Sequence, residues 1–221
     1  MINNIPIGNP TNSSASPGPL GPASPNVLDD LALDSALAAV IAGITGMDQS
    51  LVIPRDQPGS GFREPDVQYN WVSVGVMTST PMSTRAIQAH NSDGDGSTAL
   101  HQYYTLDVLV SCYGPKSNGI ARLIFDAFDI DQNRFALRAL GLNFLDVEPI
   151  RKVPGLVAAG IRRRSDLSFR LVQSIERVYL IRNILGARGA VVSANGPPED
   201  PDTKIQPFKT RLPSPSTSGG S

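Results

Sequence analysis

Apolar residues recur every three or four positions from Val27 to Thr45, and this spacing predicts a helix. Asn26 is expected to cap it, and Gly46 follows its end. Asp29 and Asp30 fall in the predicted first turn, where their charges stabilise the helix dipole. The apolar stripe consists of Leu33, Leu37, Val40, Ile41 and Ile44. We expect it to pack in the core, with a subunit interface as the alternative.

Alternation of apolar and polar residues predicts strands in the next part of the chain. Residues 51–55 form a short strand, and 71–80 form a stronger one. The clearest strand is 98–113, where one face is apolar: Tyr104, Leu106, Val108, Val110 and Cys112. The turn-forming residues of 91–97 predict a hairpin tip before this strand.

Helical spacing returns after Gly114-Pro115, with proline expected at the first helical position. The expected buried face of this helix is Ile120, Leu123, Ile124, Ala127 and Phe128. Asp131 is expected to cap a second, short helix over 134–140, which Gly141 ends. The two helices form a predicted helical pair.

Residues 142–147 and 166–172 have the alternation of strands. The alternation loses its phase near Gln173-Ser174, which predicts a bulge or a break before a strand at 178–181. The order of elements indicates an α+β fold: an antiparallel sheet with an N-terminal helix and a helical pair packed on it.

Proline is concentrated at the two ends of the chain. Of the 19 prolines, six lie in residues 1–25 and six in 195–221. Segments with few apolar side chains cannot offset the entropy of ordering, so both read as extended, flexible Pro/Gly/Ser-rich arms. Residues 26–194 are the size of one ordinary domain, which needs no disulfide or metal.

Composition excludes several classes of protein. The longest uncharged apolar run, 36–44, is far shorter than the ~20 residues that cross a bilayer, so no membrane partner is expected. The N-terminus lacks the pattern of a secretory signal. A single cysteine, Cys112, excludes an internal disulfide framework, and a net charge of -1 disfavours a strongly basic nucleic-acid binder.

Charge is unevenly distributed along the chain. Acidic residues outnumber basic ones in 1–66, whereas basic residues outnumber acidic ones in 67–194. Asp29, Asp30 and Asp34 are the candidate acidic contacts to a neighbouring copy or another partner. An uneven but merely solvated surface explains the same pattern, and both interpretations remain open.

Basic residues cluster most densely at Arg162, Arg163 and Arg164, with Arg151 and Lys152 nearby in the sequence. Such a cluster can contact DNA phosphates in a channel or acidic groups of another subunit. Ordinary solvated arginines are the alternative. Aromatic residues do not alternate with these bases as they do in single-strand binders.

Three features of the hairpin around 90–112 resemble enzyme chemistry only superficially. Asp93 and Asp95 imitate the start of a calcium loop, but Gln102 stands where the closing glutamate belongs. His90 and His101 would need further ligands to hold a metal, and Cys112 would need a nearby base to act as a nucleophile. No catalytic, metal or cofactor site is predicted.

Seven segments follow one another in a recognisable order along the chain. They are Gly43-Ile-Thr-Gly46, Leu51-Val-Ile-Pro-Arg55, Tyr69-Asn-Trp-Val72, Tyr104-Thr-Leu-Asp-Val-Leu-Val-Ser-Cys-Tyr-Gly-Pro115, Asp131-Gln-Asn-Arg134, Arg163-Arg-Ser-Asp166 and Arg177-Val-Tyr-Leu-Ile-Arg-Asn-Ile-Leu185. In this order they resemble a known family, the neck or tail terminator proteins of tailed bacteriophages. The resemblance spans about 30–193.

This resemblance implies a structural protein without catalytic activity. Such proteins are α+β subunits that form a ring, usually of six copies, at the head-proximal end of the tail. The ring ends growth of the tail tube, receives the head-completion or connector protein, and lets double-stranded DNA pass without sequence preference. The implied partners are further copies of the chain and the tail tube, with sheath proteins as another candidate. The implied place is the neck of the virion, after assembly in the host cytoplasm.

Three rival hypotheses remain at this point. The chain is a neighbouring head-completion or adaptor ring protein, or a sequence-independent DNA-binding module that uses residues 162–164, or a metal- or thiol-dependent enzyme that uses the 90–112 hairpin. The tail type and the identity of the neighbouring proteins do not follow from the sequence.

Overall fold

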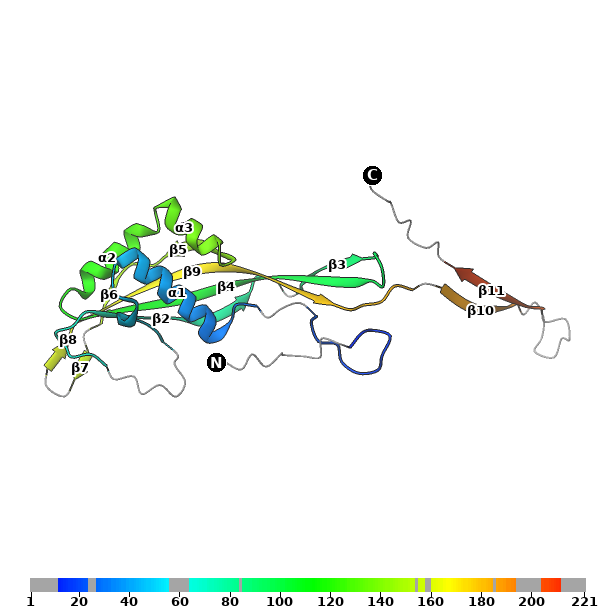
Figure 1. Ribbon diagram of the computed structural model, residues 1–221, viewed down its shortest axis with the longest axis horizontal. Coiled ribbons are helices and arrows are strands. Elements are labelled where there is room, and N and C mark those ends of the chain that lie inside the picture. The colour runs from blue at the N-terminus through cyan, green and yellow to red at the C-terminus, as the bar shows by residue number, and fades with distance from the viewer. Residues whose placement is uncertain are drawn as a thin grey trace. The chain divides into compact units, whose positions relative to one another are not determined.

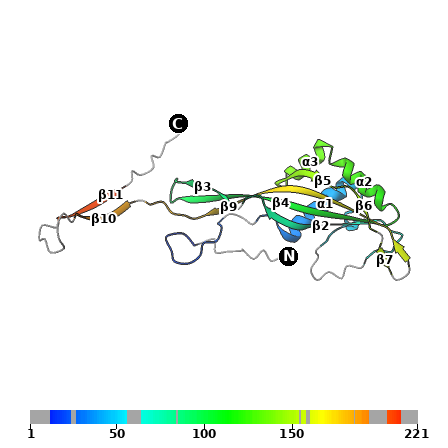
Figure 2. The same cartoon turned by 180° about the vertical axis from the view of Figure 1, so that it is seen from behind.

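The structure is a computed structural model that describes residues 12–23, 27–55, 64–83, 85–153, 155–157, 160–184, 186–193 and 204–211. The chain divides into two compact units. The larger, the core unit, contains 26–87 and 100–176, and the smaller, the terminal unit, contains 1–25, 88–99 and 177–221. Figures 1 and 2 show the elements from opposite sides.

The helices in the described part of the chain are α1 (Asp30–Thr45), α2 (Ser117–Ala127) and α3 (Asp131–Arg138), with a short 3-10 helix, η1, at Gln49–Leu51. The strands there are β1 (Val52–Pro54), β2 (Trp71–Pro81), β3 (Ile87–Asn91), β4 (Ser97–Tyr113), β5 (Leu142–Val147), β6 (Arg151–Lys152), β7 (Gly155–Val157), β8 (Gly160–Arg162), β9 (Arg164–Tyr179), β10 (Gly186–Ser193) and β11 (Lys204–Arg211).

The main sheet has the order β1-β2-β4-β9-β5, with β3 paired to β4 and β6 paired to β9. β2 and β4 are antiparallel, with Val74 opposite Val110, and β5 and β9 are antiparallel as well. β1 is parallel to β2, with Val52 opposite Val72, so both strands enter the sheet from the same end. The predicted α+β class is confirmed, and one strand pair makes the sheet mixed.

The core lies between one face of this sheet and the three helices, which cover that face (Figure 1). The apolar face of β4 is buried as predicted, from Leu106 to Cys112. Phe128 at the end of α2 packs on Phe144 of β5 and Phe169 of β9, at ring-centroid distances of 4.8 and 4.7 Å. These contacts fix the helical pair against the sheet.

α1 is confirmed, but it begins at Asp30 rather than Val27. Asp29 is the N-cap residue in an extended conformation, and Asp30 has a φ of 51°, so the helix cannot continue backwards to Asn26. Gly46 ends the helix in the left-handed conformation, and its N–H donates to Ala42 O, as glycine allows. The apolar stripe packs in the core, which confirms the first of its two interpretations.

Three details of the predicted helical pair are wrong. α2 begins at Ser117, so Pro115 lies in the preceding turn, where the Ser117 N–H donates to Gly114 O. Ala121 and Ile124 of α2 are buried, as is Phe128 just after it. Leu123 points about 100° away from the neighbouring Ile124 around the helix axis, and its side chain is 47% exposed. α3 begins at Asp131, which is therefore a first-turn residue rather than the cap.

The predicted break near Gln173-Ser174 is wrong as well, because β9 is continuous through both residues. Gln173 continues the inward-facing row and is buried. Its Nε2 donates to Leu28 O at 2.8 Å, so this polar side chain at a core-facing position has a hydrogen-bond partner. The pairing of β2 with β4 shifts register at Met77, and the pairing of β5 with β9 shifts register at Leu145.

The terminal unit contains the tip of the β3–β4 hairpin, the stretch 12–23 and the β10–β11 hairpin. The Ser14 N–H donates to Leu180 O at 3.0 Å, and the Ala23 N–H donates to Val178 O at 2.7 Å. The antiparallel β10–β11 pair forms a separate two-stranded sheet. β11 lies within 195–221, the segment expected to be the C-terminal arm. The flexibility of the two arms and their boundaries at 25 and 195 stay predictions.

Candidate assembly surfaces

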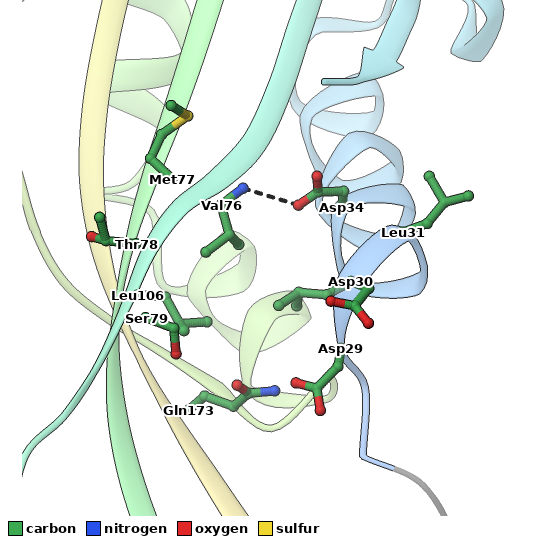
Figure 3. Close-up of a pocket in the computed structure, with 11 residues that line it drawn as sticks. Asp29, Asp30, Leu31, Asp34, Val76, Met77, Thr78, Ser79, Leu106 and Gln173 are labelled. Carbon is green, nitrogen blue, oxygen red and sulfur yellow. Dashed lines mark hydrogen bonds between the residues drawn. The ribbon is translucent and has the colours of Figure 1, made fainter. Parts of the chain in front are cut away.

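A pocket of about 390 Å³ lies between the start of α1 and β2 in the core unit (Figure 3). Asp29 and Asp30 line its acidic side and are exposed, and Met77, Thr78 and Ser79 line the opposite side. Two of the three predicted acidic contacts are therefore accessible on one surface. We call Asp29 and Asp30 the acidic surface.

Asp34, the third of these acids, is buried one turn further along α1. Its Oδ1 accepts the Val76 N–H at 2.9 Å (Figure 3). β1 ends at Pro54, opposite Val74, so Asp34 satisfies the next outward N–H of β2 in place of a neighbouring strand. The position of Asp34 thus gives it a role within the subunit.

Gly75 allows this close approach of α1 to the edge of β2. A Cβ at position 75 would lie 2.9 Å from Asp34 Oδ2 and 2.8 Å from Arg55 Cβ. Both neighbours are held, because Asp34 accepts from Val76 and the Arg55 N–H donates to Val74 O. A side chain at position 75 would push the helix from the strand.

The five predicted basic contacts separate into two sets. Arg162 has a side chain only 8% exposed and is paired with Glu64, whose side chain is 55% exposed. Its Nη2 also donates to Pro65 O at 3.0 Å. Arg162 therefore anchors 64–65 to the end of β8 instead of facing a ligand.

Arg164 also belongs to the internal set. Its Nε and Nη2 donate to the two carboxylate oxygens of Asp166 at 2.7 and 2.8 Å, and Nη2 also donates to Ser111 Oγ at 3.2 Å. The guanidinium lies 5.6 Å from the ring centroid of Tyr113. Hydrogen bonding to Asp166 raises the pKa of Arg164, so this side chain is a fixed cation on the sheet.

Arg151, Lys152 and Arg163 form the second set, which is exposed. β6 pairs with the start of β9, with Lys152 opposite Ser165, and this pairing brings the three residues to one end of the sheet. Arg151 is 3.1 Å from Glu148, a pair that solvent screens because both groups are accessible. We call these three residues the basic surface.

The hairpin residues that suggested enzyme chemistry have other partners. His90 Nδ1 lies 2.9 Å from Thr98 Oγ1, and Nε2 lies 2.9 Å from Asn183 Oδ1. His101 instead faces Glu176, and Asp95 pairs with Arg182. Within the described residues, no group of three or more His, Cys, Asp or Glu side chains is arranged to hold a metal ion.

Cys112 is fully buried on the inner face of β4. Burial, with a smaller effect from Asp166, raises the pKa of this thiol to about 12. Only the thiolate is a strong nucleophile, so Cys112 acts as a small apolar residue, as its place on the strand predicted.

Sequence reasoning missed the partners that decide which charges are available. Glu64 lies far from Arg162 in the sequence, and nothing in either local pattern indicates their contact. Asp166 was detectable in principle, because it follows Arg164 by two residues on a strand and so lies on the same face. The edge of β2 was also missed, because alternation predicts a strand but not its neighbours.

Two comparisons bear on identity. The family model described as "phage neck terminator protein" matches residues 31–201. No curated protein matches the sequence. No helix in the described ranges has both the length and the apolar character needed to cross a membrane. Because the match covers well over half of the chain, the protein belongs to the phage neck terminator family and is a structural component of the neck of the virion.

Proposed function

We propose that the protein is the subunit of a closed ring of six copies that terminates the phage tail. The observation that carries this proposal is the family match over 31–201. The ring meets the tail tube on one side and the head connector on the other, and DNA passes through its centre. Its task is mechanical and non-enzymatic.

The distribution of exposed charge supports a ring. A closed ring needs a heterologous interface, in which each copy offers one surface and receives a different one. The acidic surface lies at the start of α1, and the basic surface lies where β6 meets β9. A chain with separate surfaces of opposite charge can contact a neighbour and a second partner at the same time.

We assign the basic surface to the DNA channel. Lys152 and Arg163 are exposed and have no ion-pair partner among the described residues, so they are available to phosphates. Arg162 and Arg164 are held by Glu64 and Asp166, which leaves each copy few mobile cations in this cluster. A small number of phosphate contacts suits a channel that must release DNA, because tight binding would oppose ejection.

The test is to image the purified protein by negative-stain electron microscopy at high concentration, with light scattering for the mass. We expect closed rings with a central hole, either from the free protein or on the ends of isolated tail tubes. Tubes that gain no cap, together with a protein that stays monomeric, would refute the ring. Caps formed on the head connector but never on tubes would favour the adaptor protein instead.

A further inference from the structure

β2 has an open edge beyond the point where β1 ends. β1 pairs only with Val72, Ser73 and Val74 on one side of β2, whereas β4 pairs along the other side as far as Pro81. From Met77 to Pro81 every residue of β2 is exposed, and no described strand pairs with this edge. An open strand edge is a template for pairing with another chain.

The outward backbone groups of this edge follow from the ladder. The Met82 N–H donates to Tyr103 O, so residue 82 faces β4. Neighbouring residues alternate in direction along an antiparallel strand, so Ser79 directs its N–H and C=O to the open side. Asp34 already accepts the outward N–H of Val76. Ser79 is therefore the first residue beyond Asp34 and the Met77 bulge that offers both backbone groups to a new strand.

The pocket extends along this same edge. Met77, Thr78 and Ser79 line it together with the acidic surface (Figure 3). Met77 is 53% exposed and supplies an apolar contact. Such a site fits an extended backbone with a basic side chain that reaches Asp29 or Asp30.

The chain itself contains a segment of this kind. β10 and β11 form a two-stranded sheet without a third strand in the described part of the chain. Isolated two-stranded hairpins are marginal in water, and a further strand stabilises them. The basic residues in these strands are Arg188, Lys204, Lys209 and Arg211, and the strands contain no acidic residue.

We propose that the β10–β11 hairpin of a second copy adds to the open edge of β2, with its basic residues facing the acidic surface. This inference rests on the proposed ring, because it supplies the heterologous contact that the ring needs. Each copy then gives one hairpin and receives one. The main-chain hydrogen bonds give affinity, and the opposite charges favour this segment over others.

The first experiment places a benzophenone-bearing phenylalanine in place of Met77 in the full-length protein. Isotopically light and heavy protein are mixed at high concentration, or assembled on tail tubes, and irradiated. We expect covalent dimers whose mixed-isotope crosslinks map to residues 186–211. Intermolecular crosslinks that map elsewhere, or none at all, would overturn the proposal.

The second experiment removes only the outward N–H of the edge. Ser79→Pro deletes this donor without touching the β4 ladder, and Ser79→Ala keeps it. We expect Ser79→Pro to lose the intermolecular crosslink and Ser79→Ala to retain it, with equal circular dichroism spectra. Equal crosslinking in the two variants would contradict pairing at this edge.

A charge variant tests the contact if Ser79→Pro unfolds. Asp29→Asn combined with Asp30→Asn removes both charges while keeping the side-chain shape, and Asp131→Asn is the control at the start of another helix. We expect at least a tenfold loss of crosslinking in the double variant only. Rings that form with crosslinks elsewhere would reject the hairpin contact but not the ring, whereas hairpin crosslinks without rings or caps would reject the ring alone.

Discussion

The Asp34 side chain takes the place of a neighbouring strand at the edge of β2, just beyond the residues that pair with β1. It is buried, and its Oδ1 accepts the Val76 N–H beside the last residues paired with β1. We predict that Asp34→Ala lowers the free energy of unfolding by about 1–3 kcal/mol, because a backbone donor at a partly buried edge loses its acceptor.

The measurement for Asp34 is chemical denaturation followed by circular dichroism. Asp30→Asn is the matched control, since Asp30 is exposed on the same helix and asparagine tolerates its positive φ. We expect this control to change stability by no more than about 0.5 kcal/mol. Equal effects of the two substitutions would show that the Val76 hydrogen bond contributes nothing specific.

Cys112 gives a second test at a single side chain. Burial raises its pKa to about 12, so at pH 8 only about one thiol in ten thousand is ionised. We predict no reaction of the native protein with a maleimide over an hour, and full reaction in guanidinium. Ser83→Cys adds an exposed thiol as a control and should label promptly. Rapid labelling of Cys112 itself in the native state would mean that β4 opens readily.

At the level of secondary-structure elements, two adjacent arginines at the junction of β8 and β9 have different roles. Arg162 is buried and paired with Glu64, whereas Arg163 is exposed. We predict that Arg162→Met costs about 1–3 kcal/mol of stability and that Arg163→Met changes it by less than about 0.5 kcal/mol. Glu64 is half exposed and can be rehydrated, which keeps the first loss below that of a fully buried pair.

Thermal and chemical unfolding of both arginine variants measure this difference. A large loss for Arg163→Met would show that this exposed side chain has a structural role. No loss for Arg162→Met would show that the Glu64 pair is not maintained in solution.

The sequence predicted the elements well where one physical signal dominates. The alternation in 98–113 is clear because β4 buries one apolar face from Leu106 to Cys112. The apolar stripe of α1 is clear because this helix packs on the sheet. The errors fall where tertiary contacts override the local pattern. Gln173 looked like a break because its partner, Leu28 O, lies far away in the sequence.

The candidate surfaces were only partly predictable from the sequence. Counting charges located the acidic and basic clusters along the chain, but it could not show that Asp34, Arg162 and Arg164 are used internally. That separation depends on Val76, Glu64 and Asp166, which come into contact only in the folded chain. A charged side chain that is satisfied within the subunit adds little to a contact between subunits.

For the whole molecule, substitutions in the basic surface test whether the protein is a DNA channel or a DNA-binding module. Each phosphate contact made by a basic side chain steepens the fall of log K with log salt by about 0.9. Because Arg151, Lys152 and Arg163 are the exposed members of the predicted cluster, we predict that replacing all three with alanine makes the slope shallower by at most about 3. Arg162→Met should leave the slope unchanged, since that side chain is buried against Glu64.

Fluorescence anisotropy with a duplex of mixed sequence, across a salt series, gives both slopes. The triple variant should still form rings or caps, because the proposed subunit contact uses the acidic surface and the β10–β11 hairpin. If the triple variant loses its assembly instead, the basic surface belongs to a subunit interface and not to the channel. If Arg162→Met reduces the slope as much as the triple variant does, DNA binding must first open the Glu64 pair. A protein that must open the Glu64 pair before it binds DNA would be a regulated DNA-binding module. A passive channel has no need of such a step.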